Sequence, residues 1–277
     1  GIARQVGDLA LRARVLDLLG RLELARVQLD EAERLFAEAR SLRGIAGDRA
    51  GEAASLLHLA EVAAARGEHE AALQFQERAL RRAEEIGDGG IGTRVRVEIA
   101  GVHARLANFD EARTQLDRAL ADAATMRDEG GASRALTRLG RLLLATGKPG
   151  EAVARFEAAR EKARAATFHD GVLAAELGLG RALLAVGDPE GAKEVLTRVR
   201  DSAGKGEGRQ LEAQRLLGGC LRTLGEFAAA RAETEAALAA AARQGQAGLE
   251  LEALVDRAEL AMDLGAFDAA AEDLERA

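Results

Sequence analysis

The sequence predicts an all-α protein built from a repeated helical hairpin, and three observations support this. The 277 residues include only two Pro and no Trp or Tyr, and they are rich in Ala, Leu, Arg and Glu, a composition that favours helices over strands. Hydrophobic residues make up 48% of the chain, which is enough for a packed core and argues against disorder. A short phrase also recurs, as in LANFDEARTQLDRAL at 106–120 and LGAFDAAAEDLERA at 264–277.

The recurring phrase has a period of about 40 residues. Each copy contains an Ala at the same place, and the steps between successive copies are 40, 40, 40, 40, 38 and 40 residues. Twelve residues before this Ala the chain always has Gly or Ala. The alanines that set the register are Ala32, Ala72, Ala112, Ala152, Ala192, Ala230 and Ala270. Seven copies in register predict a stack of similar supersecondary units.

One unit is best seen in the copy around residues 133–150. Its first segment has apolar residues at helical spacing, namely Leu136, Leu139 and Leu143. Gly147 then ends the first helix, and Pro149 fits the first turn of a second one. The small residue in the first helix allows close approach, and the register Ala is expected where the two helices touch. Each unit is therefore predicted to be an antiparallel helical hairpin.

A Gly-Asp pair occurs at the junctions between units. Such a pair is typical of a helix that ends at the Gly and of a next helix with the Asp as its N-cap. Such pairs occur at Gly47-Asp48 and Gly87-Asp88. Because Gly7-Asp8 has the same register, residues 1–6 are expected to be the tail of an earlier helix, and the array to be a piece of a longer chain. The predicted repeats span 7–46, 47–86, 87–126, 127–166, 167–204, 205–244 and, incompletely, 245–277.

The small–aromatic–alanine spacing resembles the tetratricopeptide repeat, and the resemblance covers essentially the whole chain. The usual unit has 34 residues, and the 40-residue unit is similar to the long-helix variety of kinesin light chains and large bacterial regulators. The resemblance implies one right-handed superhelical solenoid. Four repeats depart from the family pattern in their first helix and are expected to pack less well, through the polar residues Arg96, Glu176, Gln214 and Arg257.

The resemblance also implies that the first helix of each repeat lines a concave groove. The middle of that groove is predicted to hold Arg94, Arg134, Arg141, Leu144, Leu177, Arg181, Leu184 and Arg215, and its last repeat holds Glu252 and Glu259. The guanidinium group of arginine binds carboxylates through paired hydrogen bonds, and apolar neighbours strengthen these hydrogen bonds by excluding water. The groove is therefore expected to bind an acidic or amphipathic part of another protein. The alternative is that these arginines pair with glutamates of adjacent repeats.

Several function classes are disfavoured by composition. The net charge is −7 and the pI about 5.4, so binding of nucleic acid is not expected. The single cysteine, Cys220, excludes an internal disulfide and a thiolate zinc site and fits a reducing cytoplasm. No apolar run is long enough for a membrane span. No nucleophile lies beside a base, and no cofactor, metal or catalytic residue is predicted. The large excess of Arg over Lys is typical of proteins from GC-rich bacterial genomes and suggests a bacterial source.

The predicted function is that of a non-catalytic, cytoplasmic scaffold or adaptor in signalling. The alternative is a sensor module that controls an attached kinase, protease or transcription regulator. An RNA- or DNA-binding solenoid and an enzyme are weaker alternatives. The only interval of 38 residues coincides with Gly204, Gly206 and Gly208, which predict a hinge rather than a phosphate-binding loop. Uncapped ends also allow end-to-end self-association.

Overall fold

The computed structural model describes residues 2–202 and 208–277, with side chains from residue 9 onward. The regular elements in these two ranges are fourteen α-helices, and no strand lies among them. The chain divides into two compact units, Gly1–Arg138 and Leu139–Ala277. The all-α class predicted from composition and periodicity is therefore confirmed.

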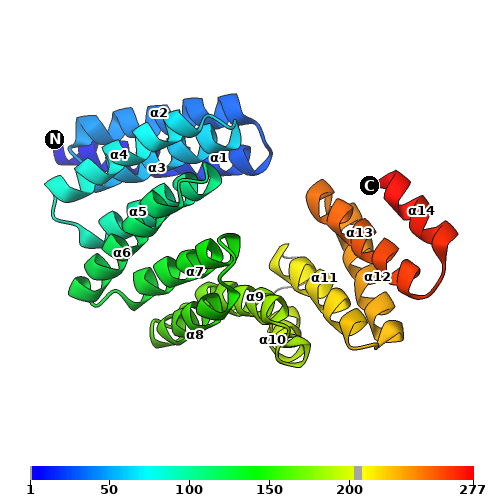
Figure 1. Ribbon diagram of the computed structural model, residues 1–277. Coiled ribbons are helices and arrows are strands. Elements are labelled where there is room, and N and C mark those ends of the chain that lie inside the picture. Colours follow the sequence, from blue (N-terminus) through cyan, green and yellow to red (C-terminus); the bar gives the residue numbers. More distant parts are fainter. Residues whose placement is uncertain (1, 203–207) are drawn as a thin grey trace. The chain divides into compact units, whose positions relative to one another are not determined.

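The first unit is a series of antiparallel hairpins (Figure 1). Successive helices from α1 to α6 pack against one another, and α3 also contacts both α1 and α5. The odd-numbered helices of this unit are therefore neighbours, as the first helices of stacked repeats should be. The elements are α1 (Ile2–Ala25), α2 (Leu29–Ala46), α3 (Arg49–Ala65), α4 (His69–Glu85), α5 (Gly89–Arg105), α6 (Phe109–Met126) and the beginning of α7 (Glu129–Ala145).

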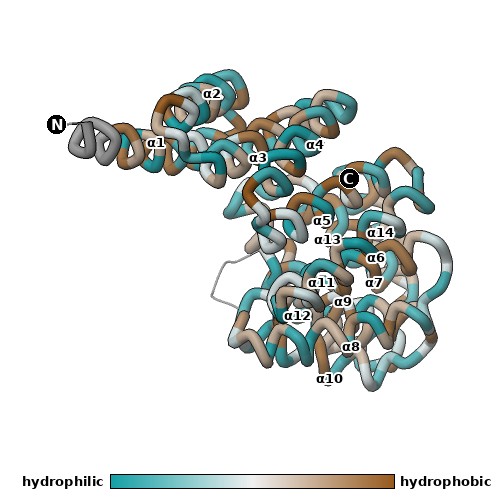
Figure 2. The backbone as a smooth tube through the Cα atoms, turned by 90° about the vertical axis from the view of Figure 1, so that its left-hand side faces the viewer, coloured by the Kyte–Doolittle hydropathy of each residue, from teal (hydrophilic) through white to brown (hydrophobic). Residues whose placement is uncertain are grey.

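The second unit repeats this arrangement. Successive helices from α8 to α14 pack against one another, and α11 also contacts α9 and α13. The elements are the end of α7, then α8 (Pro149–Ala165), α9 (His169–Val186), α10 (Pro189–Ser202), α11 (Gly208–Thr223), α12 (Phe227–Gln244), α13 (Ala247–Asp263) and α14 (Phe267–Arg276). Figure 2 shows apolar and polar stretches alternating along these helices, as expected for helices that bury one face.

The predicted helix ends are confirmed in detail. At the junction between the first two repeats Gly47 is left-handed, with φ of +70°, and the Asp48 carboxylate accepts a hydrogen bond of 2.8 Å from the backbone N–H of Gly51. The turn inside each hairpin also has one left-handed residue. Two of these turns achieve this without glycine, since Val27 has φ of +61° and Ala107 has φ of +59°. A β-branched residue in this conformation stores strain.

The core is formed by small residues facing large ones. The seven register alanines are between 0% and 2% exposed, so they do lie where helices touch. A Cβ atom added to Gly20 would lie 2.6 Å from the Phe36 ring, and one added to Gly140 would lie 2.7 Å from the Phe156 ring. Glycine at these places therefore allows the two helices of a hairpin to approach closely, as predicted.

One sequence-based expectation, a helix junction at Gly7-Asp8, differs from the structure, and another, the hinge, stays a prediction. Helix α1 begins at Ile2 and continues through Gly7 and Asp8, so this pair does not separate two helices. A glycine inside a helix costs only about 1 kcal/mol relative to Ala, which neighbouring helix-favouring residues can offset. The hinge predicted at Gly204, Gly206 and Gly208 lies almost entirely outside the described residues, because the description resumes at residue 208 with α11. No described helix is long and apolar enough to cross a bilayer.

Candidate partner-binding surface

In the first unit, two predicted groove arginines lie at the same repeat position. Arg94 on α5 and Arg134 on α7 are both exposed. The electrostatic field of Arg94 reaches Glu61 on α3. Burial raises the pKa of Glu61, but the hydrogen bond from His58 and the charges of Arg94 and Arg21 outweigh burial, so the pKa is lower than usual. Arg94 therefore faces a carboxylate on the preceding odd-numbered helix.

In the second unit, the apolar groove residues lie deeper than expected. Leu177 on α9 is only 4% exposed and packs in a core cluster with Leu173 and Leu217. Leu184 is half-buried against the same cluster, and Leu144 on α7 is half-buried as well. Arg141, one turn before Leu144, is exposed. Leu177 thus supports this surface from within the core, whereas Leu144 and Leu184 are partly accessible.

The remaining groove arginines are engaged in ion pairs between odd-numbered helices. Arg181 on α9 pairs with Glu212 on α11. Arg215 on α11 lies 3.0 Å from the Glu252 carboxylate and 2.9 Å from that of Asp256, both on α13. Despite Arg215, burial raises the pKa of Asp256 above its usual value. We call the groove arginines on the odd-numbered helices the odd-helix stripe, namely Arg94, Arg134, Arg141, Arg181 and Arg215. These contacts are the ones that the alternative interpretation of the odd-helix stripe anticipated.

The same pattern continues along α11. Arg222 lies 2.7 Å from the carboxylate of Glu259 and 2.8 Å from that of Asp263, both on α13. The two acidic groove residues of the last repeat, Glu252 and Glu259, are therefore paired with arginines of the repeat before it. Asp256 and Asp263 escaped sequence analysis, although each lies 41 residues after its arginine, and that spacing is a usable signal.

Ion pairs also replace the aromatic residue that the family pattern has early in the first helix. In the third repeat, Arg96 lies 3.1 Å from Glu84 on α4 and 2.9 Å from Asp122 on α6. Its first helix is thus tied to the even-numbered helices on both sides. The polar departure at this position is compensated by partners that the sequence pattern does not reveal.

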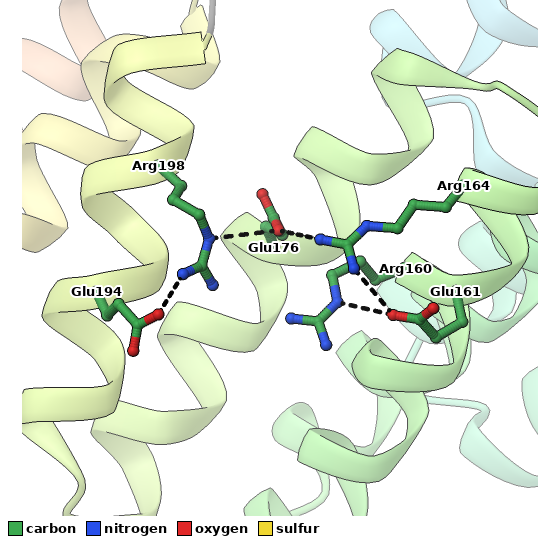
Figure 3. Close-up of polar contacts among 6 residues, drawn as sticks. All are labelled: Arg160, Glu161, Arg164, Glu176, Glu194 and Arg198. Atoms are coloured by element: carbon green, nitrogen blue, oxygen red, sulfur yellow. Dashed lines mark hydrogen bonds and ion pairs between the residues drawn. The ribbon is translucent and has the colours of Figure 1, made fainter.

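The fifth repeat has the same arrangement with reversed charges. Figure 3 shows Glu176 on α9 between Arg164 on α8 and Arg198 on α10. A Glu176 carboxylate oxygen lies 3.4 Å from Arg164 and 3.7 Å from Arg198, and the residue is only 4% exposed. Arg198 also pairs with Glu194 at 2.6 Å. A buried carboxylate is tolerated here because two guanidinium groups face it.

None of this geometry resembles a catalytic centre. No cluster of three metal-ligating side chains occurs within the part of the chain that the structure describes. Cys220 is buried, and its thiol donates a hydrogen bond of 2.8 Å to the Pro189 carbonyl. Burial raises the pKa of this thiol to about 11, which opposes formation of a nucleophilic thiolate. The candidate surface therefore consists of charged side chains, mostly arginines and carboxylates, on the faces of the helices.

The family is decided by sequence profiles. The profile described as tetratricopeptide repeat matches residues 11–85, 51–125, 93–165 and 131–205, and a second profile with the same description matches 177–247. Together they cover most of the chain. The chain belongs to the tetratricopeptide repeat family. Tetratricopeptide repeats are generally non-catalytic modules for protein interaction. No curated protein matches the sequence.

Solved structures share the tetratricopeptide repeat fold. A Rap protein complexed with competence and sporulation factor is 18% identical, with a TM-score of 0.70 over 96% of this chain and 74% of that one. The apo quorum sensor NprR from B. thuringiensis is 14% identical, with a TM-score of 0.73 over 94% and 73%. A STAND protein with a tetratricopeptide repeat sensor from Pyrococcus horikoshii is 13% identical, with a TM-score of 0.71 over 95% and 41%.

Proposed function

We propose that this chain is a non-catalytic adaptor module whose odd-numbered helices bind an acidic or amphipathic surface of a partner protein. The observation that carries the proposal is the pair of exposed arginines at one repeat position, Arg94 and Arg134. Arg141 follows two turns later on the same helix as Arg134 and is also exposed. Guanidinium groups on successive repeats suit carboxylates spaced along a partner.

The arginines of the odd-helix stripe also interact within the chain. Arg181 and Arg215 hold carboxylates of the next odd-numbered helix, so a partner would have to compete with those ion pairs. The exposed Arg94, Arg134 and Arg141 are expected to contribute to the binding as well. Leu144 and Leu184, both half-buried, add apolar contact, and Leu184 packs against the core cluster that contains Leu177.

The test is a paired affinity capture from lysate of the source organism. One bait is the wild-type chain and the other carries Arg94→Glu, Arg134→Glu and Arg141→Glu. A protein retained by the wild type and lost by this variant supports the proposal.

A matched control keeps the net charge change but moves it elsewhere. It carries Arg105→Glu, Arg113→Glu and Arg118→Glu, at three exposed residues outside the odd-helix stripe. If this control loses the same protein, the effect is one of net charge and the proposed surface is wrong. Circular dichroism must show equal helicity for all three baits.

A regulatory sensor is the second candidate, favoured by the likeness to the NprR quorum sensor and to the STAND sensor module. In this case partner binding would change the arrangement of repeats and so control an attached effector domain. Small-angle scattering separates the two. An unchanged radius of gyration of this chain on binding favours the adaptor, and a changed one favours the sensor.

Self-association is a further part of the proposal. Leu11 and Leu18 on α1 are 60% and 63% exposed, and Phe267 on α14 is 69% exposed. Apolar residues this accessible at the terminal hairpins favour end-to-end contact between copies. Sedimentation velocity should show concentration-dependent association that Leu18→Glu weakens. A monomer at all concentrations would refute this part.

A further inference from the structure

A depression lies between the even-numbered helices α2 and α4, with α3 as its floor. Its volume is about 390 Å³. Leu56, which is 3% exposed, provides an apolar floor. The walls are mostly arginine, and the lining residues are Arg40, Glu52, Leu56, Arg78, Arg81, Arg82 and Glu85. We call this the α2–α4 depression.

The fifth repeat has a charged side chain at the position that corresponds to Leu56 in the α2–α4 depression. Leu56 and Glu176 are 120 residues apart, which is three repeats of 40, so they hold the same position. Arg78 likewise corresponds to Arg198. Around α9 the position is filled by a carboxylate that faces arginines of both neighbouring even-numbered helices (Figure 3).

The α2–α4 depression lacks both groups that fill the space in the fifth repeat. Leu56 replaces the Glu176 carboxylate, and Gly44 stands 120 residues before Arg164, so the side chain that reaches in from the preceding helix is missing as well. Arg40 takes the position of Arg160 and keeps a guanidinium on that wall. The depression therefore has arginine walls but no carboxylate at the position of Glu176, and its two glutamates, Glu52 and Glu85, both pair with Arg82.

Charge pairing inside the depression is incomplete. Arg82 is neutralised by Glu52 at 3.2 Å and Glu85 at 2.6 Å. Arg81 approaches Glu77 at 3.9 Å, where both side chains are more than 60% exposed, so that pair is weak. Two arginines remain without an acidic partner among the described residues, and these are Arg40 and Arg78.

We propose that the α2–α4 depression binds an acidic segment of another protein, with a carboxylate over Leu56 between Arg40 and Arg78. The geometry favours a segment over a small free anion, because small ligands are typically 70–90% buried in their sites and the Arg78 and Arg81 walls are exposed. This site lies on the even-numbered helices. It goes beyond the proposed function, because the odd-helix stripe is not involved.

The test is an NMR titration of the Arg Nε–H signals with acetylated, amidated hexaglutamate, and with hexaglutamine as the neutral probe. Saturable shifts of Arg40 and Arg78 with hexaglutamate alone are expected. Arg40→Gln/Arg78→Gln should weaken binding at least about tenfold, since hydrogen bonds to charged groups contribute about that factor each. Arg105→Gln/Arg118→Gln removes the same charge from exposed sites elsewhere and should change the affinity less than about twofold.

A second variant imitates the fifth repeat. Leu56→Glu supplies the missing carboxylate from within and should abolish hexaglutamate binding while helicity is retained. Equal affinity of the wild type and the Arg40→Gln/Arg78→Gln variant would overturn the proposal. So would equal weakening by the control pair. Shifts of Arg40 and Arg78 with inorganic phosphate but not with hexaglutamate would show a free-anion site and would also overturn it.

Discussion

The close packing around Phe156 leads to a quantitative prediction. This ring is 0% exposed and lies against Gly140 on α7 and Gly178 on α9. A Cβ atom on Gly178 would lie 2.2 Å from Cε1 of the ring and 2.6 Å from Cδ1, distances at which something must shift. Gly178→Ala should therefore replace a fitted contact by an overpacked one.

The magnitude follows from two opposing effects. Alanine in a helix interior gains about 1 kcal/mol over glycine. Overpacking typically costs about 1–3 kcal/mol, and a fully buried ring places this site near the upper end. The net expectation is a loss of about 2 kcal/mol. Gly219→Ala on α11 is the matched control, because an added Cβ there has nothing within 4 Å and should stabilise the protein by about 1 kcal/mol.

Native-state hydrogen exchange is the appropriate assay, because repeat arrays need not unfold in one step. The opening free energy of the α8 and α9 amides should fall in Gly178→Ala. Phe156→Leu should cost less in that background than in the wild type, because it makes room for the new methyl group. The reasoning is refuted if Gly178→Ala stabilises the chain as Gly219→Ala does, or if the two changes are additive.

Four other experiments have definite expected outcomes. Val27→Gly should raise stability by about 1 kcal/mol in thermal unfolding, since it relieves a left-handed β-branched residue, and a lower melting temperature would contradict this. Cys220 should react with a thiol reagent at pH 8 only through unfolding, because its pKa of about 11 leaves little thiolate; labelling at the rate of a free thiol would disprove it. Because that pKa is raised from 9.0, the Cys220 contribution to stability should persist below pH 9 and be lost between pH 9 and about 11, which pH-dependent urea unfolding of Cys220→Ala and wild type can check. Glu176→Gln should destabilise α8–α10 by no more than about 1 kcal/mol, because the Arg164 and Arg198 side chains are 50% and 40% exposed and keep Glu161 and Glu194 as partners, and a loss of about 3 kcal/mol in the exchange of those helices would refute it.

Sequence alone determined the hairpins, their order and most of their ends. A helix cap or a left-handed turn depends on a few adjacent residues, so Gly47, Asp48 and Pro149 could be assigned from their neighbours. The register alanines were equally predictable, because a 40-residue repeat places each of them in the same local setting. The all-α class and the family follow from this periodicity.

Only the tertiary structure decided which charges meet and which leucines remain accessible. The packing of helices places Asp256 against Arg215 and buries Leu177 beneath the surface that it was predicted to line. Among the described residues it also gives Arg40 no acidic partner, and it places Leu56 at the position where the fifth repeat has Glu176. Backbone conformation is set locally, whereas the partner of a charge depends on the helices that packing brings within a few ångströms, and a single sequence period does not specify that.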